Sequence, residues 1–195
     1  AEAAKVGAVP GQAKRSAARE IIGKGLPDWT GSLINTFRYK NWDLTCDLQF
    51  VYGVDTWQLY FHSMEDRSGI ANGFATILYN GWTETNQNTM VQQIRQQNYV
   101  GQDSQADSHW VCDGSYIRGN LIQLGYTFDK KALTKYGFKK LRAYASVSNA
   151  FIVDSKDFLG YDPEAVSNGD QFGQNIFFYQ YPKPRTFTFG VNVSF

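Results

Sequence analysis

The sequence has little of several features that identify common classes of protein. Among its 195 residues are 5 prolines and 2 cysteines. No apolar run approaches the roughly 18 residues of a membrane-spanning helix. Cys46 and Cys112 lack the spacing of metal ligands, and His62 and His109 are equally isolated. We therefore expect two free thiols, with a disulfide as the alternative, and we predict neither a metal site nor a cofactor.

An excess of charge of one sign is also missing. Lysine and arginine number 19, aspartate and glutamate 18, and the formal net charge is +1. Proteins that bind nucleic acid usually carry a basic excess or a basic stripe, so nucleic acid is not an expected partner. The sequence also lacks a Ser-His-Asp pattern, a phosphate-binding loop and a cysteine cluster. We predict that the chain is not an enzyme.

Aromatic residues and strict alternation, in contrast, are abundant. Aromatics make up 16% of the chain, and the segment "PRTFTFGVNVSF" has phenylalanine or valine at every second position from Phe187 to Phe195. A period of two is typical of a β-strand with one apolar and one polar face. The mean hydropathy of -0.41 fits a membrane β-barrel too, because barrel strands are polar at every second position.

Five segments have the length and alternation of β-strands. They lie at about residues 31–39, 42–52, 115–128, 141–151 and 185–195. The connections between them alternate between short and long, at about two, sixty, a dozen and thirty residues. Transmembrane β-barrels combine short periplasmic turns with long external loops. We therefore predict an all-β fold, in which five antiparallel strands belong to a large transmembrane β-barrel with long extracellular loops.

The remaining segments show weaker patterns. Residues 1–20 are predicted to be a lead-in loop, with a short helix at Ala13–Glu20 as an alternative, and residues 21–195 to be the barrel portion. The segment "NTMVQQIRQQN", Asn88–Asn98, predicts a short helix with an apolar stripe of Met90, Val91 and Ile94.

Aromatic residues gather at the predicted strand ends. Tyr39 and Trp42 flank the first turn, and Tyr126 and Phe128 precede the next short connection. Aromatic girdles of this kind mark the two membrane interfaces of β-barrels.

Two arginines fall within predicted strands. Arg142 alternates with Leu141 and Ala143, so we expect it to face the barrel lumen. Arg118 has the parity of Ile122 and Leu124, so we expect it on the lipid side near the external rim, where a charge costs little.

Several longer motifs follow one another between about Glu20 and Phe195. They are "PDWTGSLINTFRYKNWDLTCDLQFVYG", "DGSYIRGNLIQLGYTF", "LRAYASVSNAFI" with Asn149, "GYDPE" and "YPKPRTFTFGVNVSF". In this order they resemble the C-terminal barrel portion of the SusC/RagA family of TonB-dependent outer-membrane transporters.

The resemblance implies a multi-pass protein of the bacterial outer membrane in Bacteroidota, with a plugged barrel of about 22 strands. Such proteins work with a SusD-like surface lipoprotein and import oligosaccharides or oligopeptides, using energy that TonB delivers. The resemblance also implies that assembly machinery reads the C-terminal aromatic, here Phe195. It does not extend to residues 1–19, and no metal site is assigned there.

Five strands cannot close a membrane barrel, because the smallest closed examples have about eight. We therefore expect a C-terminal portion without the plug and without the segment that contacts TonB. Other strands and the plug would come from outside these residues. The alternatives are a soluble β-rich carbohydrate-binding module, an outer-membrane enzyme and a siderophore receptor.

Aromatic residues in the two long loops are the candidate contacts for a substrate or for the lipoprotein lid. They are Trp57, Tyr60 and Trp82 in the first loop, and Phe177, Tyr179 and Tyr181 in the last. The alternative is that these side chains pack loop against loop.

Two groups of polar residues can be interpreted either as structural or as functional. Asp103, Asp107 and His109 are read as a polar external loop rather than as metal ligands. Asp162 and Glu164 are read as a structural loop motif around Pro163 rather than as an acid–base pair.

Overall fold

The structure, a computed structural model, describes residues 20–65, 72–89, 91–94, 108–134, 137–164, 175–178 and 180–195. Two units emerge, and each is described by itself. The sheet unit comprises Leu26–Asp55, Asp113–Ala165 and Tyr181–Phe195, and the loop unit comprises Ala1–Gly25, Thr56–Cys112 and Val166–Gln180.

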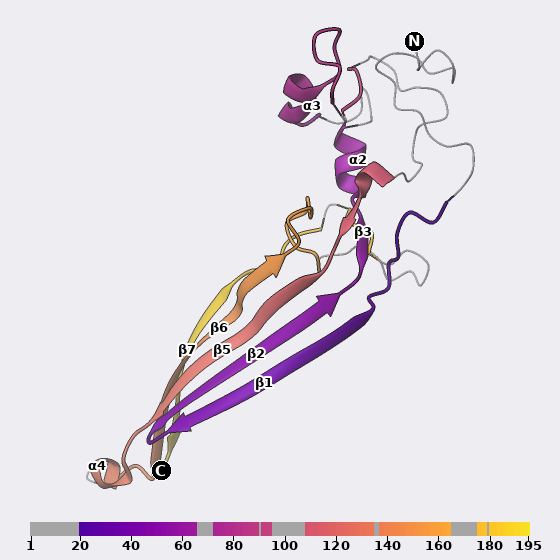
Figure 1. The fold of residues 1–195 in the computed structure, drawn as a ribbon. Helices are drawn as coiled ribbons and strands as arrows, with labels where there is room; N and C mark the ends of the chain where they lie inside the picture. Colours follow the sequence, from indigo (N-terminus) through magenta and orange to yellow (C-terminus); the bar gives the residue numbers. More distant parts are fainter. Residues whose placement is uncertain are drawn as a thin grey trace. The chain divides into compact units, whose positions relative to one another are not determined.

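The sheet unit is one antiparallel sheet of five strands, as the alternation predicts (Figure 1). In spatial order the strands are β1 (Trp29–Tyr39), β2 (Trp42–Tyr52), β5 (Tyr116–Thr127), β6 (Lys140–Asp154) and β7 (Thr186–Ser194). The main differences from the predicted bounds are that β1 starts at Trp29 and that β6 continues to Asp154. Each strand is long enough to cross a bilayer when tilted, which takes about 9–11 residues.

The register of the pairs gives the sheet two chemically distinct faces. Trp42 lies between Tyr39 and Tyr126, and Ala145 lies between Leu124 and Phe189. Repeated along the strands, this register forms an apolar face that includes Leu33, Phe37, Leu44, Leu48, Ile122, Leu124, Val147, Phe187, Phe189 and Val191. The opposite, polar face includes Thr36, Asp43, Thr45, Gln49, Gln123, Arg142, Ser146 and Thr188.

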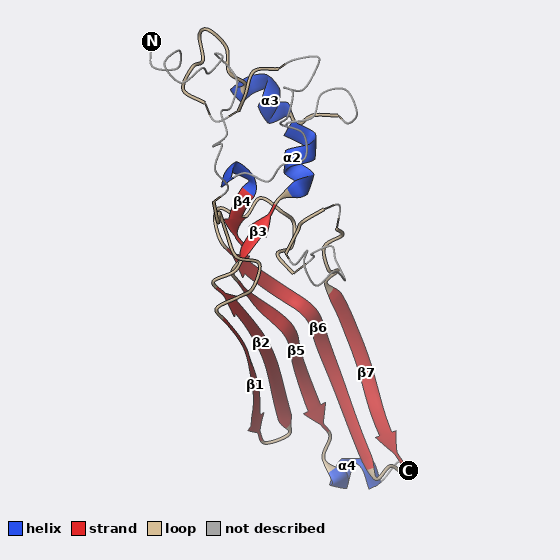
Figure 2. Ribbon diagram, turned by 90° about the vertical axis from the view of Figure 1, so that its right-hand side faces the viewer, coloured by secondary structure: helices blue, strands red, loops and turns tan. Residues whose placement is uncertain are grey.

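The short connections meet at one end of the sheet (Figure 2). Lys40 and Asn41 alone join β1 to β2, and Lys40 adopts a left-handed φ of 51°. The β5–β6 connection contains the short helix α4 (Lys130–Thr134), whose Leu133 is buried. The last strand, β7, ends at the same end. The chain leaves β2 and β6 at the other end, which carries the long connections.

A bulge in β5 overturns the prediction for Arg118. Asp47 of β2 pairs with Leu121, but the next residue, Leu48, pairs with Gly119, so Asn120 is an extra residue in β5. One inserted residue moves every later side chain to the other face. Arg118 therefore shares the polar face with Gln49, its partner in β2, and it is buried with 2% of its surface exposed.

Among its described residues, the loop unit contains only short elements. They are α2 (Leu59–Glu65), α3 (Ala75–Asn80), the 3-10 turn η1 (Ser108–Trp110) and most of the paired strands β3 (Asp55–Trp57) and β4 (Val111–Asp113). None of the helices in the described part of the chain has the length and apolar character needed to span a membrane.

The helix predicted at Asn88–Asn98 is wrong for the part that the structure describes, residues 88–89 and 91–94. Hydrogen bonds to other segments replace helical ones there. The Val91 carbonyl accepts from the Trp82 amide at 3.0 Å, and the Thr89 hydroxyl donates to the Asn80 carbonyl at 2.5 Å. The alternative helix at Ala13–Glu20 lies, apart from Glu20, outside the described residues.

The contact between Tyr144 and Gly190 generates a prediction about stability. These residues pair across β6 and β7, and a Cβ on Gly190 would collide with two ring carbons and the hydroxyl oxygen of Tyr144. We expect Gly190→Ala to lower the free energy of unfolding by about 1–3 kcal/mol, because the ring must leave its place.

The matched control is Gly31→Ala in β1, where an added Cβ meets its nearest atom at an ordinary 3.8 Å. It should leave the free energy of unfolding unchanged or raise it slightly. Denaturant titration of both variants measures the difference. Equal effects of the two substitutions would contradict the packing role of Tyr144.

Candidate functional site

The apolar face of the sheet is exposed across all five strands. Phe189 is 81% exposed, Phe187 63% and Phe37 60%. Exposed apolar patches beyond a few hundred Å² are rare on soluble monomers and indicate contact with lipid or another protein. A soluble sandwich would cover this face with a second sheet, and within the described residues no second sheet does so. The geometry therefore favours a wall that faces hydrocarbon.

Aromatic rings flank this apolar face at both ends of the strands. At the end with the short connections, the Trp42 and Tyr126 ring centroids are 4.7 Å apart, and those of Tyr126 and Phe128 are 5.0 Å apart. At the other end, Trp29 stacks on Tyr52 at 5.8 Å. This is the arrangement that the positions of the aromatic residues in the sequence predict, and it is typical of the interfacial girdles of β-barrels.

The polar face carries an ion pair between strands that are not adjacent. Arg142 of β6 lies on the face opposite Leu141 and Ala143, as predicted, and reaches across β5 to Asp43 of β2. Its Nε donates to Asp43 Oδ1 at 3.1 Å, and its Nη2 donates to Asp43 Oδ2. The guanidinium passes over Gly125, where a Cβ would collide with both partners. The bidentate pair thus ties β2 to β6 across a glycine.

A second ion-pair cluster surrounds the buried Arg118. Its Nη2 donates to Asp162 Oδ1, and both side chains are at most 4% exposed. Its Nε lies 2.8 Å from Glu164 Oε2, an ion pair whose atoms are too poorly aligned for a hydrogen bond. Glu164 also pairs with the Lys183 ammonium at 2.5 Å. The two carboxylates therefore act as structural partners of cations, which supports the structural interpretation of the "GYDPE" motif.

Backbone and amide contacts complete this Arg118 cluster. Asp162 Oδ2 accepts from the Lys183 amide at 3.2 Å, and Asp162 Oδ1 accepts from the Glu164 amide at 3.0 Å. Asn149 sits in a left-handed conformation in β6 with a φ of 51°, its Oδ1 accepts from Arg118, and its Nδ2 donates to the Pro184 carbonyl at 2.9 Å. Residues from four of the sequence motifs, "SYIRGN", "VSNAF", "GYDPE" and "YPKPR", thus meet at one buried place.

Sequence reasoning missed this cluster, although it identified the motifs one by one. The available signal was an arginine on a strand together with two carboxylates beside a proline in a later loop. The bulge at Asn120, which turns Arg118 toward those carboxylates, has no sequence signature strong enough to predict it.

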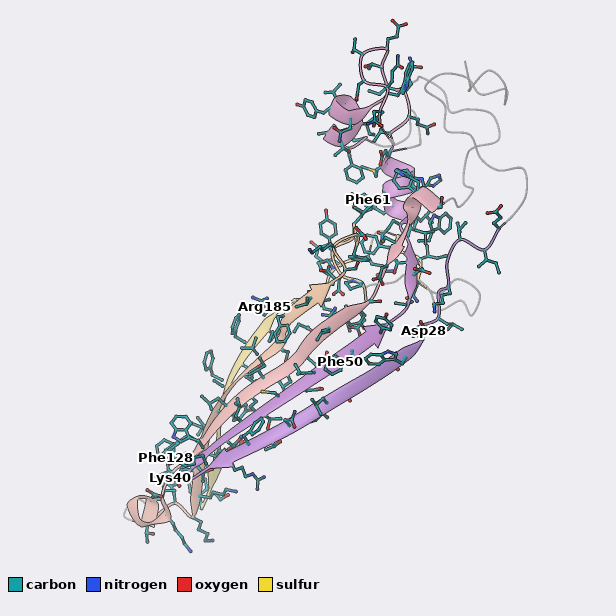
Figure 3. The ribbon with its side chains drawn as sticks, viewed as in Figure 1. Asp28, Lys40, Phe50, Phe61, Phe128 and Arg185 are labelled. Carbon is teal, nitrogen blue, oxygen red and sulfur yellow. The ribbon has the colours of Figure 1, made fainter. Side chains whose placement is uncertain are left out.

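Three predicted contact residues, Trp57, Tyr60 and Phe177, come together in the loop unit. The Phe177 amide donates to the Trp57 carbonyl at 2.9 Å, and the Phe177 carbonyl accepts from the Tyr60 amide at 3.0 Å. The Tyr60 ring meets Phe177 edge-on, with centroids 6.4 Å apart. Phe177 is 1% exposed, so its side chain contacts only neighbouring residues, while Trp57 and Tyr60 are half-buried. Figure 3 labels Phe61, whose ring stacks on Phe74 at 5.0 Å in the same aromatic cluster.

The other predicted contacts lie apart from this aromatic cluster. Trp82 is half-buried just after α3, and Tyr181, in the sheet unit, is 92% exposed. Tyr179 lies outside the described residues, as do Asp103 and Asp107. Phe195 is 75% exposed, and its ring centroid is 5.4 Å from that of Phe138.

Cys46 and Cys112 form no disulfide bond with each other, in agreement with the expectation from the sequence. Cys112 accepts a hydrogen bond from the Gln58 amide group at 3.2 Å inside the loop unit. Within the described ranges, no group of three or more histidine, cysteine, aspartate or glutamate side chains is arranged to hold a metal ion.

The burial of the Arg118 cluster generates a prediction. Arg118→Met keeps the length of the side chain but leaves Asp162 buried without its cation. Removal of one partner from a buried ion pair typically costs about 3–5 kcal/mol. We expect loss of stability of this order, and faster cleavage by trypsin at Lys156 in the β6–β7 connection that the cluster fixes.

The matched control is Arg142→Met. It breaks an ion pair of similar geometry whose side chains are 19% and 21% exposed, so a smaller loss of stability and no change in cleavage at Lys156 are expected. Thermal unfolding and timed proteolysis report both quantities. If Arg118→Met leaves the cleavage rate unchanged, the cluster does not fix the connection.

Comparison with known proteins places these features in context. No protein-family model matches the chain. "TonB-dependent receptor P3" of Formosa agariphila is 35% identical over 185 residues, which cover 92% of this chain and 18% of that protein. "TonB-dependent receptor SusC" of Bacteroides thetaiotaomicron is 24% identical over 176 residues, which cover 90% of this chain and 16% of that protein. The chain thus spans less than a fifth of the length of these curated relatives. Their names describe receptors rather than enzymes, and their sources fit the expected Bacteroidota.

Solved structures show the same similarity. The structure of the RagAB peptide transporter superposes with a TM-score of 0.71 at 25% identity, over 88% of this chain and 17% of that chain. The RagAB peptide importer in its closed-closed state gives a TM-score of 0.74 at 24% identity, over 94% of this chain and 19% of that chain, and shows the fold alone. With the curated relatives, the sheet topology and the exposed apolar face, these similarities lead to one conclusion: the chain belongs to the SusC/RagA family of TonB-dependent receptors and supplies five antiparallel strands of its transmembrane β-barrel.

Proposed function

We propose that this chain is part of a TonB-dependent importer in the bacterial outer membrane, where its sheet unit forms a section of the barrel wall. The observation that carries the proposal is the apolar face, exposed over five strands in a chain whose aligned relatives are TonB-dependent receptors. Residues 21–195 act as the barrel portion, and residues 1–20 lead into it.

The two faces of the sheet have different tasks in this proposal. The apolar face contacts lipid hydrocarbon between the two aromatic girdles. The polar face lines the interior, where the Asp43–Arg142 pair lies away from lipid and braces three neighbouring strands against one another. Charges on the lipid side would be destabilising by about 2–4 kcal/mol at the membrane midplane, so this division of the faces is required by energetics.

Energy coupling and gating belong to parts of the protein outside these residues. A plug and a segment that contacts TonB supply the movement that opens a path, and a SusD-like surface lipoprotein closes over the external loops. The similarity of this chain to RagAB and to SusC supports a SusD-like lipoprotein as the partner.

The cargo we propose is an oligopeptide or an oligosaccharide. A peptide is supported by the RagAB structures, which are described as a peptide transporter and a peptide importer. An oligosaccharide is supported by the aromatic residues of the long loops, because flat rings provide stacking platforms for sugars. The two cargoes are distinguished by direct uptake measurements.

Within the loops, Trp57, Tyr60, Trp82, Tyr179 and Tyr181 are the proposed contacts for cargo or lid. Tyr181 presents nearly its whole side chain, and Trp57, Tyr60 and Trp82 present part of theirs. Phe177 contributes indirectly, because its buried ring packs edge-on against the Tyr60 ring.

Uptake in cells tests the importer directly. A strain that lacks the gene for this receptor should lose uptake of labelled oligopeptides or labelled oligosaccharides, and a strain without TonB should lose the same uptake. The cargo that shows both losses is the substrate class. Normal uptake of both classes in the receptor mutant, or recovery of the receptor in the soluble fraction, would refute the proposal.

Two loop substitutions test the proposed contacts. We expect Trp82→Ala and Tyr181→Ala to raise the concentration of cargo needed for half-maximal uptake about fivefold or more, since aromatic contacts at binding surfaces often contribute over about 1 kcal/mol. Trp82→Phe and Tyr181→Phe keep a ring and serve as controls. If the alanine and phenylalanine variants behave alike, and the amount of receptor in the membrane is unchanged, these residues do not contact the cargo.

A further inference from the structure

The end of the sheet with the short connections carries exposed lysines. Lys40 forms the β1–β2 turn, Lys130 opens α4, and Lys139 and Lys140 lead into β6. All four side chains are exposed. Figure 3 shows Lys40 and Phe128 at this end of the strands. We call these four residues the lysine rim.

Hydrogen bonds between the connections hold the lysine rim in place. Next to Lys40, the Asn41 carbonyl accepts from the Thr127 amide at 2.8 Å, and the Asn41 side chain donates to Asp129 Oδ1 at 2.8 Å. The Lys139 amide donates to the Ser194 carbonyl, also at 2.8 Å. The turns that carry the four lysines are therefore bonded to neighbouring strands and keep their positive charges at one end.

Among the described residues of the sheet unit, the four positive charges of the lysine rim exceed the negative charge beside them. The nearby Asp43 is paired with Arg142, and the Asp129 carboxylate, which accepts from the neutral Asn41 amide, offsets one positive charge. None of the ion pairs formed among the described residues involves Lys40, Lys130, Lys139 or Lys140. A surface of this kind attracts anions over about a Debye length.

An aromatic girdle lies immediately beside the lysine rim. Tyr39, Trp42, Tyr126 and Phe128 occupy the adjoining strand ends, and the Lys40 ammonium is 5.4 Å from the centroid of the Tyr39 ring. Tyrosine and tryptophan girdles sit at the level of the lipid head groups. Lysines just beyond such a girdle are therefore at the depth of the phosphates.

We propose that the lysine rim binds the phosphates of anionic phospholipids in the leaflet around the short-connection end of the barrel. This inference rests on the proposed membrane location. Each lysine near an anionic membrane surface strengthens binding about fivefold, so four together make a selective contact. Zwitterionic lipids lack the net charge and should bind weakly. The contact would fix the height of the barrel wall in the membrane.

The experiment uses the full-length receptor in nanodiscs that contain phosphatidylcholine with or without phosphatidylglycerol. After transfer to detergent, native mass spectrometry counts the retained lipids. We expect the unmodified receptor to retain phosphatidylglycerol selectively, and the variant with Lys40→Gln, Lys130→Gln, Lys139→Gln and Lys140→Gln to retain at least tenfold less. Retention should also fall steeply as the salt concentration rises.

Two controls separate charge from position. Replacing the same four lysines with arginine keeps the charge and should keep the lipid. Lys156→Gln removes an exposed lysine after β6, at the end with the long connections, and should change nothing. At equal ionic strength, inorganic phosphate should displace no more lipid than sodium chloride does, because free phosphate lacks the acyl chains that hold the head group beside the girdle.

Equal retention of phosphatidylglycerol by the glutamine variant and the unmodified receptor overturns the inference. So does equal retention of phosphatidylcholine and phosphatidylglycerol, or greater displacement by inorganic phosphate than by sodium chloride at equal ionic strength. If the lysines bind an acidic periplasmic protein in place of lipid, the inference is also overturned. Incorporation of the receptor into nanodiscs and its cargo uptake are scored separately, so a failure of the proposed function is distinguishable from a failure of lipid binding.

Discussion

The burial of the Arg118 guanidinium is the constraint around which the end of the sheet with the long connections is organised. A buried cation must be paired and hydrogen-bonded, because the desolvation penalty of an uncompensated charge amounts to several kcal/mol. Asp162, Glu164 and Asn149 meet this requirement, and each comes from a different part of the chain than Arg118. The demand for partners explains why an Asp-Pro-Glu turn, a left-handed asparagine in a strand and a Lys-Pro segment occur together in one sequence. The long β6–β7 connection is thereby fixed where it leaves β6 and where it enters β7.

The bulge at Asn120 decides whether that cluster can exist at all. With regular alternation through β5, Arg118 would share the face of Ile122 and Leu124 and would meet lipid. The extra residue returns Ile117 to the apolar face, opposite Phe50, and sends Arg118 to the polar face. A β-bulge is a common means of re-aiming a side chain near the rim of a barrel. Here it allows the apolar face to continue without interruption and at the same time brings a charge to the loops.

The sequence predicts the features that depend on local periodicity and on connection length. The strand positions, the apolar and polar faces, the turn at Lys40-Asn41 and the position of Arg142 on the polar face all follow from alternation between neighbouring residues and from connection length. The side of Arg118 does not, because a single inserted residue is visible only in the pairing with β2 and β6. The helix at Asn88–Asn98 is wrong for a related reason, since the Trp82 amide, several residues upstream, takes the Val91 carbonyl that a helix would use, and the Asn80 carbonyl holds the Thr89 side chain. Tertiary contacts likewise decide whether the loop aromatics point to a ligand or pack against one another. The burial of Phe177 shows that its side chain packs against other residues, which the sequence of the loop could not reveal.

The two edge strands of the described sheet, β1 and β7, have unpaired backbone groups that need partners in the intact protein. Among the described residues, strands β1 and β7 each pair on one side only. In hydrocarbon an unpaired backbone amide or carbonyl costs several kcal/mol, so a sheet whose apolar face meets lipid needs strands beyond both edges. The curated relatives are more than five times longer than the part of them that this chain matches, which is ample length to supply those strands. Within the described residues, the Asp43–Arg142 pair braces the polar face and the Arg118 cluster joins the two ends of the β6–β7 connection, so side-chain ion pairs hold the sheet together in addition to its backbone hydrogen bonds.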